Sequence, residues 1–113
     1  MHIEILSVEG DVYSAKLSGP VSDTDGRTKT LEHDGVDVYT KTVLLDLSEA
    51  NYINSSGIGW MVSCHKRAVE HGGKIIFHSP QPLVDQTLKM MRIDKALHLV
   101  ENLDAARNLA SGA

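Results

Sequence analysis

The chain has 113 residues, of which 42% are hydrophobic and 23% charged, and its formal net charge is -4. This length supports one domain with a modest core, so residues 1–113 are predicted to fold as a single unit. The acidic balance provides no basic surface for nucleic acid or for an anionic membrane, and both are excluded as expected partners.

The sequence also lacks signals for export or membrane insertion. No apolar run approaches the ~20 residues that cross a bilayer, and the first residues carry no basic start of a signal peptide. A cytoplasmic location is therefore expected. The single cysteine, Cys64, cannot form an internal disulfide and is expected to pack as a small apolar side chain. The six histidines show no metal-binding spacing, so neither a metal site nor a cofactor is predicted.

The chain opens with a predicted hairpin. Alternating apolar residues indicate strands over about 2–8 and 11–18, with Glu9-Gly10-Asp11 as the turn. Gly19-Pro20 is expected to end the second strand, because proline lacks the N–H that a continuing ladder needs. The following segment, 21–42, has few large apolar residues. We predict a short helix over about 24–34 and then a loop.

The central stretch reads as strand, connection and helix. Residues 43–47 form an apolar run of strand length, and residues 48–52 are a polar connection. Asn54-Ser55-Ser56-Gly57 then opens an amphipathic helix that should end near His71, before Gly72-Gly73. Asn and Ser oxygens accept the orphan N–H groups of a first helical turn, and that position also favours a negative charge.

The last third continues the alternation of strands and helices. We predict a strand over 74–77, a helix over about 82–92, a strand over 97–100 and a helix capped by Asn102. The fold class is therefore α/β, with a mixed, mostly parallel sheet of about five strands and about four helices. The apolar face expected for the last helix comprises Leu103, Ala106, Leu109 and Ala110.

The phase of the central helix separates a core face from a flank. Trp60 falls on the flank, where it either anchors a partner or packs under a neighbouring loop. His65 is expected to be a hydrogen-bonded core histidine. The predicted core face comprises Met61, Val62, His65, Ala68 and Val69, and the flank comprises Trp60, Ser63, Cys64 and Arg67.

Catalysis is not predicted. A serine nucleophile needs a base and an oxyanion hole, and the G-x-S-x-G elbow is absent around Ser55 and Ser56. Gly57-Ile58-Gly59 lacks the spacing of a phosphate-binding glycine loop. A binding module fits these observations better than an enzyme does.

The stretch LDLSEANYINSSGIGWMV, together with Gly72-Gly73 and the apolar helix after Pro80 to Pro82, resembles the STAS domain of bacterial anti-sigma-factor antagonists. The resemblance covers nearly the whole chain. In that family a D-S-S-G or D-S-T-G turn follows a buried strand, and a partner kinase phosphorylates the first hydroxyl. The resemblance places the phosphoacceptor at Ser55, with Ser56 as second choice. Asn54 replaces the usual Asp, and segment 21–42 differs from the regular helix of the family.

The resemblance implies a regulator of transcription that is switched by phosphorylation. The partner would be an anti-sigma factor with serine kinase activity, and a PP2C-type phosphatase would reset the switch. The alternative is a constitutive scaffold or transport-associated STAS domain in which Ser55 is only a helix cap. A homodimer through an exposed Trp60 or an edge strand stays open. The expected partner-binding residues are Asn54, Ser55, Ser56, Gly57, Ile58 and Trp60.

Overall fold

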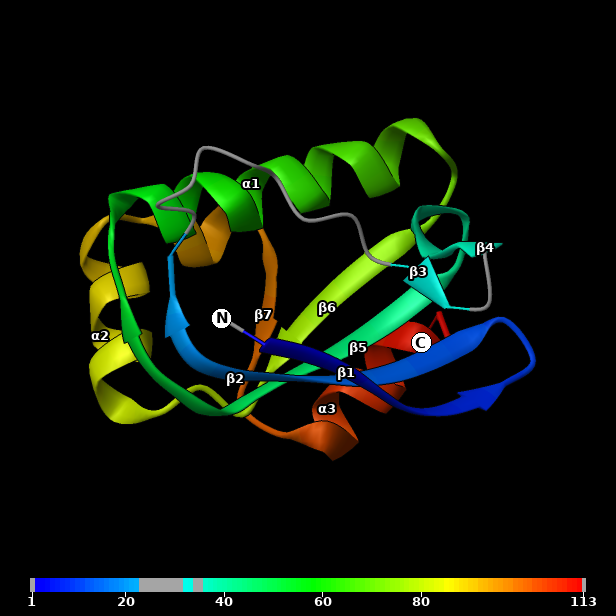
Figure 1. The fold of residues 1–113 in the computed structure, drawn as a ribbon, viewed down its shortest axis with the longest axis horizontal. Coiled ribbons are helices and arrows are strands. Elements are labelled where there is room, and N and C mark those ends of the chain that lie inside the picture. Colours follow the sequence, from blue (N-terminus) through cyan, green and yellow to red (C-terminus); the bar gives the residue numbers. More distant parts are fainter. Residues whose placement is uncertain (1, 23–31, 34–35, 113) are drawn as a thin grey trace.

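A five-stranded sheet with helices on both faces forms the body of the molecule (Figure 1). The computed structural model describes residues 2–22, 32–33 and 36–112. Two short strands and two 3-10 turns accompany the main elements: β3 (Glu32–His33), β4 (Val36–Asp37), η1 (Val38–Thr40) and η2 (Ile93–Lys95). The sheet strands are β1 (His2–Glu9), β2 (Val12–Val21), β5 (Thr42–Ile53), β6 (Lys74–His78) and β7 (His98–Val100), and the helices are α1 (Ser55–Glu70), α2 (Pro82–Met90) and α3 (Leu103–Ala110).

The sheet has the mixed, mostly parallel character that the sequence predicts. Its order is β1-β2-β5-β6-β7, in which β1 and β2 form an antiparallel hairpin and the other neighbouring pairs are parallel. The described residues contain three α-helices rather than about four. The predicted helix over 24–34 lies largely outside the described residues. Its expected end is wrong, because Glu32–His33 pairs antiparallel with Val36–Asp37 instead.

The second strand does not end at Gly19-Pro20 as predicted. Gly19 adopts a φ of 80°, and the register of β2 on β5 shifts between Gly19 and Pro20. Such a bulge accommodates a proline inside a strand, because the ladder is already interrupted there. β2 therefore continues to Val21, which pairs with Ile53 at the end of β5.

The polar connection predicted over 48–52 is also strand. β5 pairs with β6 only as far as Asp46, opposite His78, and beyond that point it follows β2 alone. One side of this extension faces solvent, which explains why its sequence is polar. The Gln81 side chain, just before α2, donates a hydrogen bond to the Ser48 carbonyl oxygen over 2.8 Å. This bond ties the extension to the start of α2.

The core has two parts, one on each face of the sheet. On the larger side, α1 and α2 pack over Leu45, Phe77 and their neighbours. On the other side α3 covers Leu44 and Ile76 through Ala106, and Figure 1 shows α1 and α3 on opposite sides of the sheet. Parallel strands that are covered on both faces read as continuous apolar runs, as β5 and β6 do.

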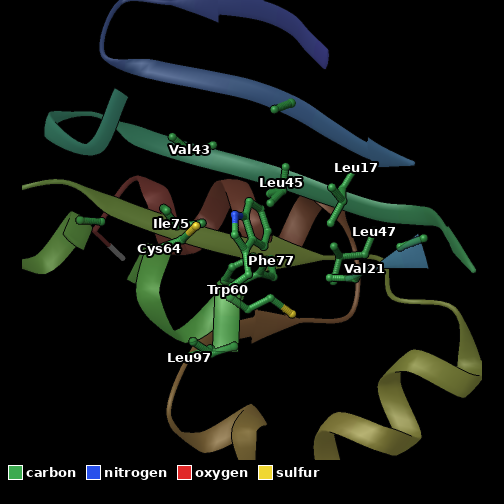
Figure 2. Close-up of a cluster of buried hydrophobic side chains, with 14 of the residues drawn as sticks. Leu17, Val21, Val43, Leu45, Leu47, Trp60, Cys64, Ile75, Phe77 and Leu97 are labelled. Carbon is green, nitrogen blue, oxygen red and sulfur yellow. The ribbon is translucent and has the colours of Figure 1, made fainter. Parts of the chain in front are cut away.

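The buried face of α1 differs from the predicted one. Trp60 and Cys64 were assigned to a flank, but each is 1% exposed, and Figure 2 shows the indole beside Cys64 and Phe77. Cys64 thus packs as the small apolar side chain that was expected. Val69, assigned to the core, is 62% exposed. The face that meets the sheet is therefore rotated toward the Trp60 side of the helix.

Candidate functional site

The candidate site lies where β2 and β5 end together and α1 begins. Val21 and Ile53 are the last register partners, and the Asn54 N–H then donates to the Val21 carbonyl oxygen over 3.3 Å. Gly57 packs against the same carbonyl so closely that a Cβ on it would overlap the Val21 backbone. The first turn of α1 is thus seated directly on the end of β2.

Asn54 is the N-cap of α1. Its backbone is extended, with φ -122° and ψ -178°, and its Oδ1 accepts a hydrogen bond from the Gly57 N–H over 2.9 Å. The same oxygen accepts from the Ser56 hydroxyl over 2.7 Å. A side-chain oxygen in this position satisfies orphan donors of the first turn. The predicted helix start is confirmed, and the cap is Asn54 rather than Ser55.

Ser22 completes this arrangement, although it is distant in sequence. The Asn54 Nδ2 group donates to Ser22 Oγ over 2.9 Å, and Ser22 Oγ lies 3.3 Å from Ser56 Oγ. The sequence alone does not mark Ser22 as part of this site. Nothing in the local pattern indicates a contact across 32 positions.

The two adjacent serines have different environments. Ser55 is exposed, and no hydrogen bond joins its hydroxyl to any residue in the described ranges. Ser56 is half-buried and donates to Asn54. Both lie in the first turn of a 16-residue helix, where free N–H groups and the macrodipole favour a negative group.

The remaining residues expected to contact a partner face inward. Gly57 is buried against Val21, and Ile58 is 8% exposed. The prediction that Trp60 contributes to a partner surface is wrong, because its ring fills the core beneath the first turns of α1 (Figure 2). Gly59, by contrast, is exposed one turn after Ser55.

Ser55 lies within an uncharged part of the chain. From Ala50 to Cys64 the sequence contains no Asp, Glu, Lys, Arg or His. The exposed side chains in this run include Tyr52, which is 49% exposed. A charge added at Ser55 would therefore have no charged neighbour along this stretch.

The expected hydrogen bond of His65 is not found among the described residues. Its buried Nδ1 has no partner in that part of the chain, and its ring meets that of His98 edge-on with centroids 5.3 Å apart. Burial, followed by the charges of His65 and Lys74, lowers the pKa of His98. In the described ranges no three His, Cys, Asp or Glu side chains gather as metal ligands would, and no helix is both long and apolar enough to cross a membrane.

Comparison with known proteins places this geometry in a family. The profile of the STAS domain matches residues 2–106. The structure of TM1081, a candidate anti-sigma factor antagonist of Thermotoga maritima, superimposes with a TM-score of 0.73 at 19% identity over 97% of this chain and 93% of that one. The anti-sigma factor antagonist SpoIIAA, in its unphosphorylated form, gives a TM-score of 0.69 at 15% identity over 99% and 98%.

The same fold also occurs inside a much longer protein. The murine anion transporter Slc26a9 matches with a TM-score of 0.65 at 14% identity, over 91% of this chain and 18% of its own length. At these identities the structural likeness establishes a shared fold.

Proposed function

The chain belongs to the STAS domain family, and from that premise we propose that it is a non-enzymatic binding module, an anti-sigma-factor antagonist. Unmodified, the surface around Ser55 docks an anti-sigma factor that has serine kinase activity. Phosphorylation of Ser55 releases that partner, and a PP2C-type phosphatase restores the docking form. All of these events take place in the cytoplasm.

One observation carries the proposal: Ser55 has an exposed hydroxyl, without a hydrogen bond to any described residue, at the first position of a 16-residue helix. A kinase must bring a donor phosphate in line with the acceptor oxygen, which requires such access. Once added, the phosphate gains stabilisation from the free N–H groups of the helix start. Ser55 is therefore the proposed acceptor, ahead of Ser56.

The switch follows from comparing the free and the bound states. A phosphate adds about -1.5 to -2 charge and a strongly hydrated group. The free domain accommodates this charge at the helix start, whereas a docked partner must desolvate it beside an uncharged first turn of α1. A tenfold loss of affinity requires only ~1.4 kcal/mol, less than the usual cost of burying an unpaired charge.

The docking surface we propose is smaller than the one expected from the sequence. It comprises Asn54, Ser55 and Ser56 with exposed Gly59 one turn later, since Trp60 is in the core. Burial of Trp60 also removes it as a homodimer contact, which leaves the edge strand β1 as the route to a dimer.

The second candidate function is a constitutive scaffold or transport-associated domain. Two observations favour it: Asn54 occupies the position of the family's usual Asp, and an anion transporter contains the same fold. In this alternative the cap is Asn54, and Ser55 is an exposed first-turn residue that is never modified.

Binding by variants of Ser55 distinguishes the two functions. Each serine-kinase-like anti-sigma factor encoded in the source genome would be purified and titrated by calorimetry with wild type, Ser55→Ala and Ser55→Asp. We expect Ser55→Ala to retain binding and Ser55→Asp to lose about tenfold or more, because a carboxylate mimics part of the phosphate charge.

Ser63 provides the matched control. It is an exposed serine two turns further along α1, so Ser63→Asp adds the same charge to the same helix away from the proposed surface. Equal binding by Ser55→Ala and Ser55→Asp would contradict the switch and favour the scaffold. Peptide mass spectrometry of protein from its native cell then identifies the phosphorylated serine.

A further inference from the structure

Ser22 has no assigned role, yet it contacts both polar side chains of the α1 cap. We infer that Ser22 is a positioning residue which, with Asn54, holds the Ser56 hydroxyl out of phosphoryl transfer and leaves Ser55 as the acceptor. This inference rests on the proposed function for its biological meaning. The claim that Ser22 positions Asn54 and Ser56 depends only on the hydrogen bonds between these side chains.

The direction of each hydrogen bond follows from the donors available. The Asn54 amide group has only hydrogens to offer, so Ser22 Oγ accepts from it. The Ser56 hydroxyl donates its hydrogen to Asn54 Oδ1. The contact between the two serine oxygens, 3.3 Å, is therefore donated by Ser22 and accepted by Ser56. The three side chains form a closed ring, which we call the Ser22 clasp.

Asn54 makes the clasp possible, because it both donates and accepts. An aspartate at this position has only acceptor atoms when ionised, so it could still receive the Gly57 N–H but could not donate to Ser22. The residue that departs from the usual family pattern is thus the one that engages Ser22.

The clasp affects the chemistry of the two serines differently. In phosphoryl transfer a hydroxyl oxygen forms a bond to the γ-phosphorus of a nucleoside triphosphate while the bond to the β-phosphate oxygen breaks. The diphosphate leaves, and the hydroxyl proton passes to the kinase's base. In Ser56 the hydrogen is held by an amide oxygen, which is no base, and the oxygen accepts from Ser22. In Ser55, by contrast, no described residue holds the hydroxyl hydrogen or donates to the hydroxyl oxygen, so both can take part in the transfer.

The first test needs no kinase. Amide hydrogen exchange of the Gly57 N–H, followed by NMR, reports on the Asn54 cap directly. We expect Ser22→Ala to speed this exchange about fivefold, because the cap side chain loses one hydrogen bond that orients it. Ser22→Thr, which keeps a hydroxyl, should restore the wild-type rate, and Ser63→Ala should not change it. An unchanged rate in Ser22→Ala would overturn the inference.

The second test asks which oxygen reacts, with the kinase-type partner of the proposed function and ATP. Ser55→Ala should take up no phosphate, whereas the double variant Ser22→Ala/Ser55→Ala should be phosphorylated on Ser56. The control is Ser55→Ala/Ser63→Ala, which should stay unmodified. Fast phosphorylation of Ser56 in Ser55→Ala, or none in the Ser22 double variant, would refute the selective role. If wild type itself takes no phosphate, the proposed function fails, and the exchange rates still decide whether Ser22 positions the cap.

Discussion

His78 is the one histidine among the described residues that is buried, at 4% exposure. Its Nδ1 lies 2.8 Å from Ser79 Oγ, and its strand position pairs with Asp46. Burial lowers the pKa of His78 below its ordinary value, and the charge of Asp46 offsets this only in part. Protonation is therefore less favourable in the folded chain than in the unfolded one.

This difference predicts how stability depends on pH. The stability contributed by neutral, buried His78 is fully present above the pKa of about 6.5 that the side chain has in the unfolded chain. It is lost as the pH falls toward the lower pKa of the folded state. We expect urea unfolding to show a smaller free energy at pH 5.5 than at pH 7.5. The drop should shrink in His78→Gln and persist in His2→Gln, which changes an exposed histidine. An equal drop in all three proteins would contradict this assignment.

Single residues were the least predictable from sequence. The start of α1 and its cap followed from local chemistry, because Asn, Ser and Gly act on N–H groups two or three positions away. The proposal that Ser55 is a phosphoacceptor came instead from the family resemblance. The engagement of Ser22 depends on two strands ending side by side, which no local pattern encodes. Trp60 was misassigned because helical periodicity gives the width of an apolar face but not which neighbour covers its edge.

At the scale of elements, α1 contains two glycines with opposite demands. A side chain on Gly57 would meet the Val21 carbonyl oxygen, since the first helical turn rests on the end of β2. Gly59, two residues later, has open space where a Cβ would be. Substituting Gly57 and Gly59 in turn therefore distinguishes two effects: the cost of a clash with the backbone of β2, and the intrinsic helix preference of the new residue.

The two glycines should respond in opposite directions to alanine. We expect Gly59→Ala to raise the free energy of unfolding by about 0.5–1 kcal/mol, because alanine is the better helix former. Gly57→Ala should lower it by about 1–3 kcal/mol, since the helix start must move away from β2. Thermal unfolding by circular dichroism measures both. Similar changes in the two variants would mean that the contact at Gly57 is relaxed in solution.

The elements themselves were mostly predictable, and the exceptions share a cause. Hairpin, helices and strands appear where apolar period and capping residues indicate them. The end of β5 was misread as a loop because several of its side chains after Asp46 are exposed and polar, although the strand still pairs with β2. Gly19-Pro20 was misread as a stop because a bulge, which depends on the partner strand, absorbs the proline.

At the scale of the whole molecule, the two parts of the core share the same strands. Leu44 and Ile76 face α3, while Leu45 and Phe77, their neighbours in sequence, face α1. Neither side can lose its packing without disturbing the strands that support the other. The mostly parallel sheet was predictable from the alternation of elements, whereas the division of helices between the two faces was not.

This sharing predicts a single unfolding transition. Trp60, the only tryptophan, reports on the α1 side through its fluorescence, and circular dichroism reports on the whole fold. We expect both signals to have the same urea midpoint. Leu44→Ala, a change on the α3 side, should lower stability by about 2–5 kcal/mol and shift both midpoints equally. Two separate midpoints would show that the two sides unfold independently.

The uncharged run from Ala50 to Cys64 has one more consequence, which concerns how fast partners meet. The run itself contributes no charge that would steer a partner toward the start of α1. A phosphate on Ser55 would add such a charge, whose influence reaches about 8–10 Å before salt screens it. The salt dependence of the association rate should therefore differ between the modified and the unmodified molecule.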